Sequence, residues 1–205
     1  MGFYMKLTKK FFKENTLPKV NAAEIAQFEL VVMTDDNIDN KLSEVAGNEI
    51  DDERRSKIAE EKKLIDEAKT PEEYISIMRK HSDPFNRRAI CQRVADKGDE
   101  VMPEVLRYYY RNLTDSFLET AAMTVYLSDK KYTAELYENY SRIKAPYGQA
   151  LACLMFQMKK IDDEEKLVDL LYDEFVRFKL RYGGESYYEF PLLALKDIYE
   201  TSTRK

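Results

Sequence analysis

The sequence predicts an all-α protein built largely from antiparallel helix pairs. Three observations lead to this prediction. Glycine and proline are scarce, at six each in 205 residues. The composition, 44% apolar and 35% charged, suits helices with one apolar and one charged face. Helix-start signatures also recur at regular intervals through the second half of the chain. A chain of this length is able to bury one sizeable hydrophobic core.

The N-terminal quarter is polarised by charge. Residues 1–20 carry five lysines against one glutamate, a net charge of +4. Residues 21–53 carry ten acidic residues against one lysine, a net charge of −9, and the rest of the chain is nearly balanced. This contrast predicts a boundary between a polarised helical or extended region, residues 1–51, and a helical-repeat domain, residues 52–205.

The first predicted helix begins at a capping-box-like sequence, Asn21-Ala-Ala-Glu24, and runs toward Met33. A strand over Phe28–Met33 is the alternative, because that segment contains β-branched residues. Residues 35–52 then form an acidic connector, with a short helix at Ile38–Ala46 that Gly47 ends.

Helix-start signatures define the remaining elements. Residues 52–69 alternate apolar and charged residues in a helical pattern. Thr70 then predicts an N-cap, with Pro71 in the first helical position and Glu73 reaching back to the cap. Further starts are predicted at Asp83-Pro84, at Asp99, at Ser116 with Glu119, at Asp162 with Glu165, and at Ser186 with Glu189.

These starts define pairs of helices with a period near thirty residues. The first helices are expected at 84–97, 116–128, 146–160 and 187–201, and the second at 99–112, 130–144 and 163–182. Small apolar centres recur in the first helices at Ala89-Ile90-Cys91, Ala121-Ala122-Met123 and Ala150-Leu151-Ala152. Small residues at these centres allow successive hairpins to approach closely.

On this period, these centres and this pairing, residues 84–201 resemble HEAT-type α-superhelical repeats. The resemblance implies a right-handed α-α superhelix of about three and a half hairpins. The tetratricopeptide pattern is absent, because the chain has no tryptophan. An irregular helical bundle is the alternative fold.

Few residues have the pattern of a catalytic or metal site. His81 is the only histidine, which argues against catalytic triads and most zinc sites. Cys91 and Cys153 lie far apart in apolar stretches, as expected for buried free thiols in a reducing compartment. The acidic run Asp162–Glu165 fits a helix start, and Gly183-Gly184 fits a helix terminator. We therefore expect no enzyme activity, no cofactor and no metal.

Tyrosine and arginine residues gather on the predicted second helices. Tyr109 follows the core spacing set by Met102, Val105 and Leu106, so at least one neighbouring tyrosine is expected to be exposed or at a helix edge. In a solenoid these helices line the concave surface, and Tyr and Arg are typical of binding hot spots. The alternative is an amphipathic helix edge with basic charge near helix C-termini. The candidate partner-binding residues are Arg107, Tyr108, Tyr110, Arg111, Tyr137, Tyr140, Arg142, Tyr172, Arg177 and Arg181.

The sequence favours a protein or peptide partner in the cytoplasm, and a homo-oligomer is compatible with it. The net charge of −5 disfavours nucleic acid, although a glycosylase-like HEAT enzyme is one alternative function. An acidic immunity or antitoxin-like inhibitor of a basic enzyme is another, suggested by residues 21–53. No apolar run is long enough to span a bilayer. The basic N-terminus is expected to touch a membrane or a partner, or, as the favoured alternative, to dock on the acidic 21–53 segment or on a second copy.

Overall fold

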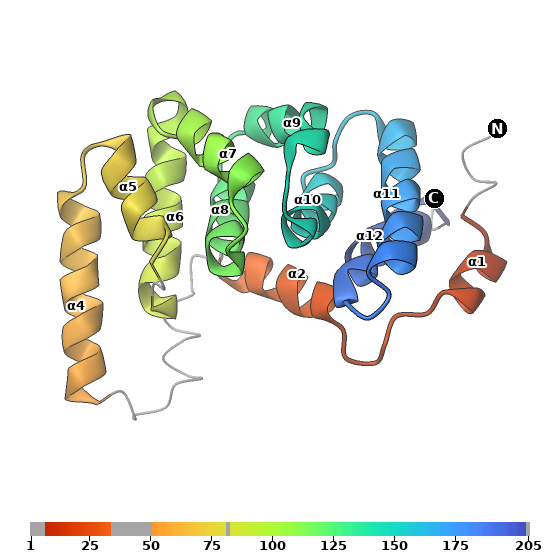
Figure 1. Cartoon of the computed structure of the whole chain (residues 1–205), viewed down its shortest axis with the longest axis horizontal. Helices are drawn as coiled ribbons and strands as arrows, with labels where there is room; N and C mark the ends of the chain where they lie inside the picture. The colour runs from red at the N-terminus through yellow and green to blue at the C-terminus, as the bar shows by residue number, and fades with distance from the viewer. Residues whose placement is uncertain (1–6, 34–50, 81–82, 204–205) are drawn as a thin grey trace. The chain divides into compact units, whose positions relative to one another are not determined.

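The computed structural model describes residues 7–33, 51–80 and 83–203, which form eleven α-helices, three short 3-10 helices and no strand (Figure 1). The all-α prediction is confirmed. The strand considered for Phe28–Met33 is wrong, because these residues lie in the helix α2 (Ala22–Met33). Asn21 caps the start of α2: its side-chain oxygen accepts a hydrogen bond from the Glu24 N–H at 2.8 Å. The helix expected at Ile38–Ala46 lies outside the described residues.

Tertiary contacts divide the chain into two compact units. The central unit is Glu29–Gly148, and the terminal unit combines Met1–Phe28 with Gln149–Lys205. This grouping follows contacts and not charge zones, and the boundary expected between residues 51 and 52 stays a prediction. Helices α2 and α10 (Pro146–Met158) contribute residues to both units.

The central unit consists of consecutive short helices. They are α4 (Asp52–Glu67), α5 (Pro71–Met78), α6 (Pro84–Lys97), η2 (Gly98–Glu100), α7 (Met102–Arg111), α8 (Asp115–Leu127), α9 (Lys130–Glu138) and η3 (Tyr140–Arg142). Helix α6 packs on α8, and α7 packs on both α8 and α9. Between these two pairs, the first helices α6 and α8 contact each other, and so do the second helices α7 and α9.

Small buried side chains lie where α6 and α8 meet. Ile90 and Cys91 on α6 and Ala121 and Ala122 on α8 are fully buried. The Cys91 thiol donates to the carbonyl oxygen of Thr120 at 3.4 Å, across the two helices. This is the close approach that small residues permit, although Ala89, expected in the same centre, is exposed.

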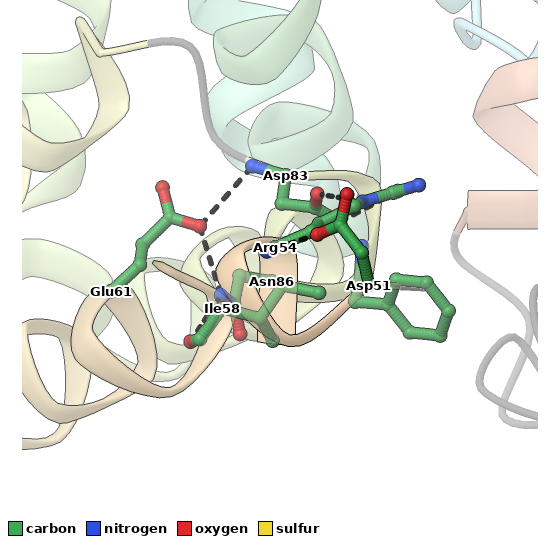
Figure 2. Close-up of polar contacts among 7 residues, drawn as sticks. Asp51, Arg54, Ile58, Glu61, Asp83 and Asn86 are labelled. Carbon is green, nitrogen blue, oxygen red and sulfur yellow. Dashed lines mark hydrogen bonds and ion pairs between the residues drawn. The ribbon is translucent and has the colours of Figure 1, made fainter. Parts of the chain in front are cut away.

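Helix α4 is tied to the start of α6 by a network of polar contacts (Figure 2). The residue Asn86 is only 3% exposed. Its side-chain amide nitrogen donates to the Ile58 carbonyl oxygen at 2.9 Å and to the Glu61 carboxylate at 2.8 Å. The same Glu61 oxygen accepts from the Asp83 backbone N–H at 3.1 Å. The Arg54 guanidinium pairs with both Asp83 oxygens, at 2.8 and 3.3 Å.

Several predicted helix starts are confirmed in their atomic detail. Thr70 caps α5 by accepting from the Glu73 N–H at 3.3 Å, and the Glu73 carboxylate accepts from the Thr70 N–H at 3.0 Å, a complete capping box. Asp83 caps α6 by accepting from the Phe85 N–H at 3.1 Å, with Pro84 in the first position.

Other predicted caps are wrong, and each has a physical reason. Asp99 does not begin α7; its carboxylate binds the Lys131 ammonium and accepts from the Tyr132 hydroxyl at 2.7 Å. Helix α8 begins one residue before Ser116, without a side-chain cap, and Glu119 accepts from the Tyr147 hydroxyl at 2.8 Å.

The remaining corrections concern the terminal unit and α9. The cap of α11 (Glu164–Arg181) is Asp163 and not Asp162. Ser186 lies in η4 (Ser186–Tyr188) ahead of α12 (Glu189–Thr203), and the Glu189 carboxylate accepts from the Ala22 N–H. The helix expected over 130–144 ends at Glu138, and a 3-10 turn follows it.

In the terminal unit α11 packs on α12, and the short α1 (Lys9–Glu14) docks on both. The Phe11 ring lies 5.7 Å from Tyr172 and 5.5 Å from Phe175, and the Phe12 ring lies 4.9 Å from Tyr199. The described part of the basic N-terminal stretch therefore docks on aromatic side chains of its own chain. Most of the acidic segment that the charge pattern suggested as its docking site lies outside the described residues.

The turn after α11 matches the prediction for Gly183-Gly184. The helix ends at Arg181, and a Cβ atom at Gly183 would come within 2.9 Å of the Lys179 carbonyl oxygen. Among the described helices, none combines the length and apolar character needed to cross a membrane.

Candidate functional site

Helix α7 separates a buried face from a basic edge. Met102, Val105, Leu106 and Tyr109 are buried, as their spacing predicted. The Tyr109 hydroxyl donates to the Gly148 carbonyl oxygen at 2.8 Å. Tyr109 is thus a core residue with a satisfied hydroxyl.

Tyr110 was expected in an exposed groove but is only 4% exposed. The chain that follows η3 folds over it, because the Lys144 N–H donates to the Tyr110 carbonyl oxygen at 3.1 Å. The Arg142 guanidinium carbon lies 4.6 Å from the centre of its ring. The Tyr110 hydroxyl is buried and has no hydrogen-bond partner among the residues that the structure describes.

The environment keeps this hydroxyl in its neutral form. Burial, and then the negative charge of Glu135, raise the pKa of Tyr110 to about 12, against the opposing effect of Arg142. A neutral phenol is a hydrogen-bond donor, so an acceptor supplied from outside the chain would give the Tyr110 hydroxyl a hydrogen-bond partner.

Tyr110 also lines an open cleft of about 520 Å³ at the C-terminal end of α7. The other lining residues are Arg111, Ser141, Arg142 and Lys144, all four of them exposed. We call this the basic cleft. Arg111 is the last residue of α7, Arg142 closes η3, and Lys144 lies in the loop before α10.

The three cations of the basic cleft have no carboxylate partner in the part of the chain that the structure describes. Among residues 7–33, 51–80 and 83–203, no carboxylate oxygen lies within 4.0 Å of the charged nitrogens of Arg111, Arg142 or Lys144. Within the same residues, the Arg142 guanidinium donates to the neutral Asn139 side-chain oxygen at 3.3 Å. Arg111 lies near enough to Glu104 to contribute to lowering the pKa of that carboxyl, without pairing with it.

Arg107 and Tyr108 lie beside a second, smaller cleft of about 360 Å³, which Tyr108, Arg79 and Glu104 help to line. Here the charge is compensated: the Arg107 guanidinium donates to both Glu104 oxygens, with its carbon 4.8 Å from the Tyr108 ring centre. Hydrogen bonding to Glu104 raises the pKa of Arg107, and the same bond lowers the pKa of Glu104.

The remaining candidates of the central unit are packed side chains. Tyr140 is 8% exposed and Tyr137 is half-buried. Tyr110 and Tyr140 were both candidates for the partner-binding groove, and the structure buries both. In the central unit the candidate arginines are therefore exposed, whereas the candidate tyrosines are buried or half-buried.

Two of the three candidates of the terminal unit, Arg177 and Tyr172, serve packing. Arg177 donates to the Glu174 carboxylate, which is itself buried, and to Gln149 at 2.6 Å. Tyr172 is half-buried against Phe11. Arg181 is exposed in the last turn of α11, where a cation suits the helix dipole.

Two residues of the basic cleft, Ser141 and Lys144, were not among the candidates identified from the sequence. Both flank Arg142 in the segment Ser141-Arg-Ile-Lys144, which was assigned to a continuous helix over 130–144. The available signal was Ala145-Pro146: a proline disfavours helical backbone in the residue before it. Pro146 therefore predicts an extended stretch before it, so that Lys144 lies outside the preceding helix.

No other constellation in the described residues suggests a reaction. Cys91 and Cys153 are fully buried, as predicted, and neither forms a disulfide within the described residues. Burial raises the pKa of Cys91 to about 11. No group of three or more His, Cys, Asp or Glu side chains suited to a metal occurs in the part that the structure describes. His81 and most of the acidic segment, residues 34–50, lie outside it.

Comparisons with protein-family models, with curated proteins and with solved structures gave no match. The basic cleft is therefore interpreted from its own geometry and charge.

Proposed function

We propose that this chain is a non-catalytic binding module that recognises an acidic segment of a protein partner through the basic cleft. The observation that carries the proposal is the group of three cations, Arg111, Arg142 and Lys144, without carboxylate partners in the described residues. Charged side chains on a surface normally gain little from isolated pairs, but converging cations create a field that attracts anionic partners.

We also propose that the hairpins of residues 84–201 are HEAT-type repeats that present this cleft on a concave face. The packing of α6 on α8 and of α7 on α9 supports repeat-like stacking within the central unit. The buried small residues Cys91, Ala121 and Ala122 support it as well, because they allow helix axes to come close.

An apolar contact is available beside the cations. Leu113, two residues beyond Arg111, is 70% exposed. A partner segment that combines acidic residues with one apolar side chain would match this surface, since interfaces join a buried apolar anchor to a polar rim.

The test is a peptide-display selection on the intact chain, followed by binding measurements with the enriched peptides. We expect acidic peptides to be enriched, and their affinity to fall as salt rises. Arg111→Ala, Arg142→Ala and Lys144→Ala should each weaken binding by roughly tenfold, the range for charge-assisted hydrogen bonds. Lys57→Ala is the matched control, because Lys57 is an exposed lysine of α4 in the same unit.

Enrichment of neutral or basic peptides, or undiminished binding by the three variants, would contradict the proposal. Nucleic acid is the competing ligand, because the cleft is a local cluster of cations in an acidic chain. Short duplex and single-stranded DNA should show no binding at low salt. If duplex DNA does bind through all three cations, the plot of log affinity against log salt should have a slope of roughly −3.

A further inference from the structure

The basic cleft holds more positive charge than its place in the fold requires. The C-terminal end of a helix carries about half a negative charge, which one cation in the last turn offsets. Arg111 already occupies that position on α7. Arg142 and Lys144 belong to η3 and to the following loop, and they bring two further charges to the same cleft.

The neutral groups of the cleft are hydrogen-bond donors as well. Ser141 is an exposed hydroxyl of η3, and Tyr110 is a buried phenol whose hydroxyl has no partner in the described chain. Leaving a buried hydroxyl without a partner is costly, and native proteins do so rarely. The Arg142 side chain is exposed and its guanidinium lies over the Tyr110 ring, so a movement of Arg142 would uncover that ring.

The nearby acidic residues limit which anion fits. The negative charge of Glu135 contributes to raising the pKa of Tyr110, and the charges of Glu104 and Arg111 interact. These two carboxylates therefore partly reduce the positive field of the three cations. A single carboxylate would neutralise one charge and use two acceptor oxygens. A phosphate monoester carries a charge of about −1.5 to −2 at neutral pH and three acceptor oxygens, which match several converging donors.

We propose that the basic cleft binds the phosphate group of a phosphorylated side chain in the partner segment, with Arg111, Arg142 and Lys144 as the charged contacts and with Ser141 and Tyr110 as neutral donors. This inference rests on the proposed function, because it names the group that the peptide-binding cleft recognises. Arg142 would exchange its contact over the Tyr110 ring for the phosphate, and the Tyr110 hydroxyl would gain an acceptor.

The experiment uses the full chain and three degenerate peptide libraries that differ only at one central residue: phosphoserine, glutamate or serine. Binding is measured by fluorescence polarisation. We expect the phosphoserine library to bind at least roughly tenfold more tightly than the glutamate library, and the serine library to bind least. Arg142→Ala and Lys144→Ala should remove most of this preference, and Lys57→Ala should retain it.

Tyr110→Phe separates the hydroxyl from the ring. The substitution keeps the buried ring beneath Arg142, so folding is retained, and thermal melting followed by circular dichroism checks this. We expect a loss of roughly three- to tenfold in affinity for the phosphoserine library and little change for the serine library.

A second arm identifies the source of the phosphate. Inorganic phosphate is titrated into the ¹⁵N-labelled chain, and the amides of Ser141 and Lys144 are followed by NMR. Shifts at these amides, reduced in Arg142→Ala, support an oxyanion site. If inorganic phosphate binds but the phosphoserine library binds no better than the serine library, the cleft takes free phosphate, and the peptide part of the inference is overturned.

The outcomes also separate this inference from the proposed function. Equal binding of glutamate and phosphoserine libraries would overturn the phosphate preference and leave an acidic-peptide module. Binding of all three libraries without effect of the cleft variants would overturn both.

Discussion

The guanidinium of Arg142 covers the ring of Tyr110, with 4.6 Å between the guanidinium carbon and the ring centre. The two residues come from separate elements, η3 and α7, and the backbone bond from Lys144 to the Tyr110 carbonyl holds those elements together. The arginine stays exposed while the tyrosine is buried. The pair therefore gives the basic cleft a positive charge and a buried hydroxyl that has no hydrogen-bond partner in the described residues.

Tyr110→Phe should stabilise the fold. The substitution removes a buried hydroxyl without a hydrogen-bond partner in the described residues and keeps the ring that Arg142 covers. We expect the free energy of unfolding to rise by about 1 kcal/mol. Urea denaturation followed by circular dichroism measures it.

Tyr109→Phe is the matched control on the adjacent position. Its hydroxyl donates to the Gly148 carbonyl oxygen, so its removal should lower the free energy of unfolding by about 1 kcal/mol. Equal destabilisation by both substitutions would mean that Tyr110 has a hydrogen bond in the folded protein.

Asn86→Ala should destabilise the packing of α4 on α6. The substitution removes a buried amide that donates to the Ile58 carbonyl and to Glu61, and it leaves that carbonyl without this donor. We expect a loss of about 1–3 kcal/mol in the free energy of unfolding. Arg54→Ala in the same network (Figure 2) should cost less, because its ion pair with Asp83 is solvent-accessible.

Urea denaturation of both variants checks this prediction. A larger loss for Arg54→Ala than for Asn86→Ala would show that the surface ion pair, and not the buried amide, holds the two helices.

Stability should fall in acid partly through Asp99. The hydrogen bond from Lys131, and then that from Tyr132, lower the pKa of Asp99 in the folded protein. A carboxyl group with a lowered folded-state pKa binds fewer protons in the folded state. Its contribution is therefore present above the unfolded pKa of about 3.9 and is lost as the pH falls through the folded value.

Asp99→Asn should accordingly reduce the dependence of unfolding free energy on pH between about pH 5 and about pH 2. Urea denaturation across this range measures the slope. Lys131→Met should reduce the slope as well, because it removes the first cause of the shift. A slope that is unchanged in both variants would exclude this pair as a source of acid sensitivity.

Both thiols should react only when the protein opens. Cys91 and Cys153 are fully buried, and burial raises the pKa of Cys91 to about 11, so little thiolate forms near neutral pH. Labelling with a disulfide reagent such as DTNB should be slow in native buffer and should accelerate with urea in parallel with unfolding. Rapid labelling of either cysteine without denaturant would contradict this expectation.

Local sequence determined the helices of this protein. Thr70 with Glu73 and Asp83 with Pro84 mark real starts, because their bonds join groups within three residues of one another. The apolar period on α7 likewise placed Tyr109 in the core, since burial on a helix repeats every 3.6 residues.

Tertiary structure decided the polar residues that have long-range partners. Asp99, Glu119 and Glu189 each have the residue type and spacing of a helix cap, yet they bind Lys131 and Tyr132, the Tyr147 hydroxyl, and the Ala22 N–H respectively. A carboxylate accepts as readily from a distant donor as from a nearby one. Sequence spacing alone does not distinguish the two.

The basic cleft divides in the same way. Its arginines, Arg111 and Arg142, were identified from residue type and from their place near helix ends. The burial of Tyr110 and the approach of Ser141 and Lys144 depend on a loop that folds back over the end of α7. Helix formation is decided by neighbours within four residues. A cleft is decided by which helix ends and loops meet, and only the folded chain brings these together.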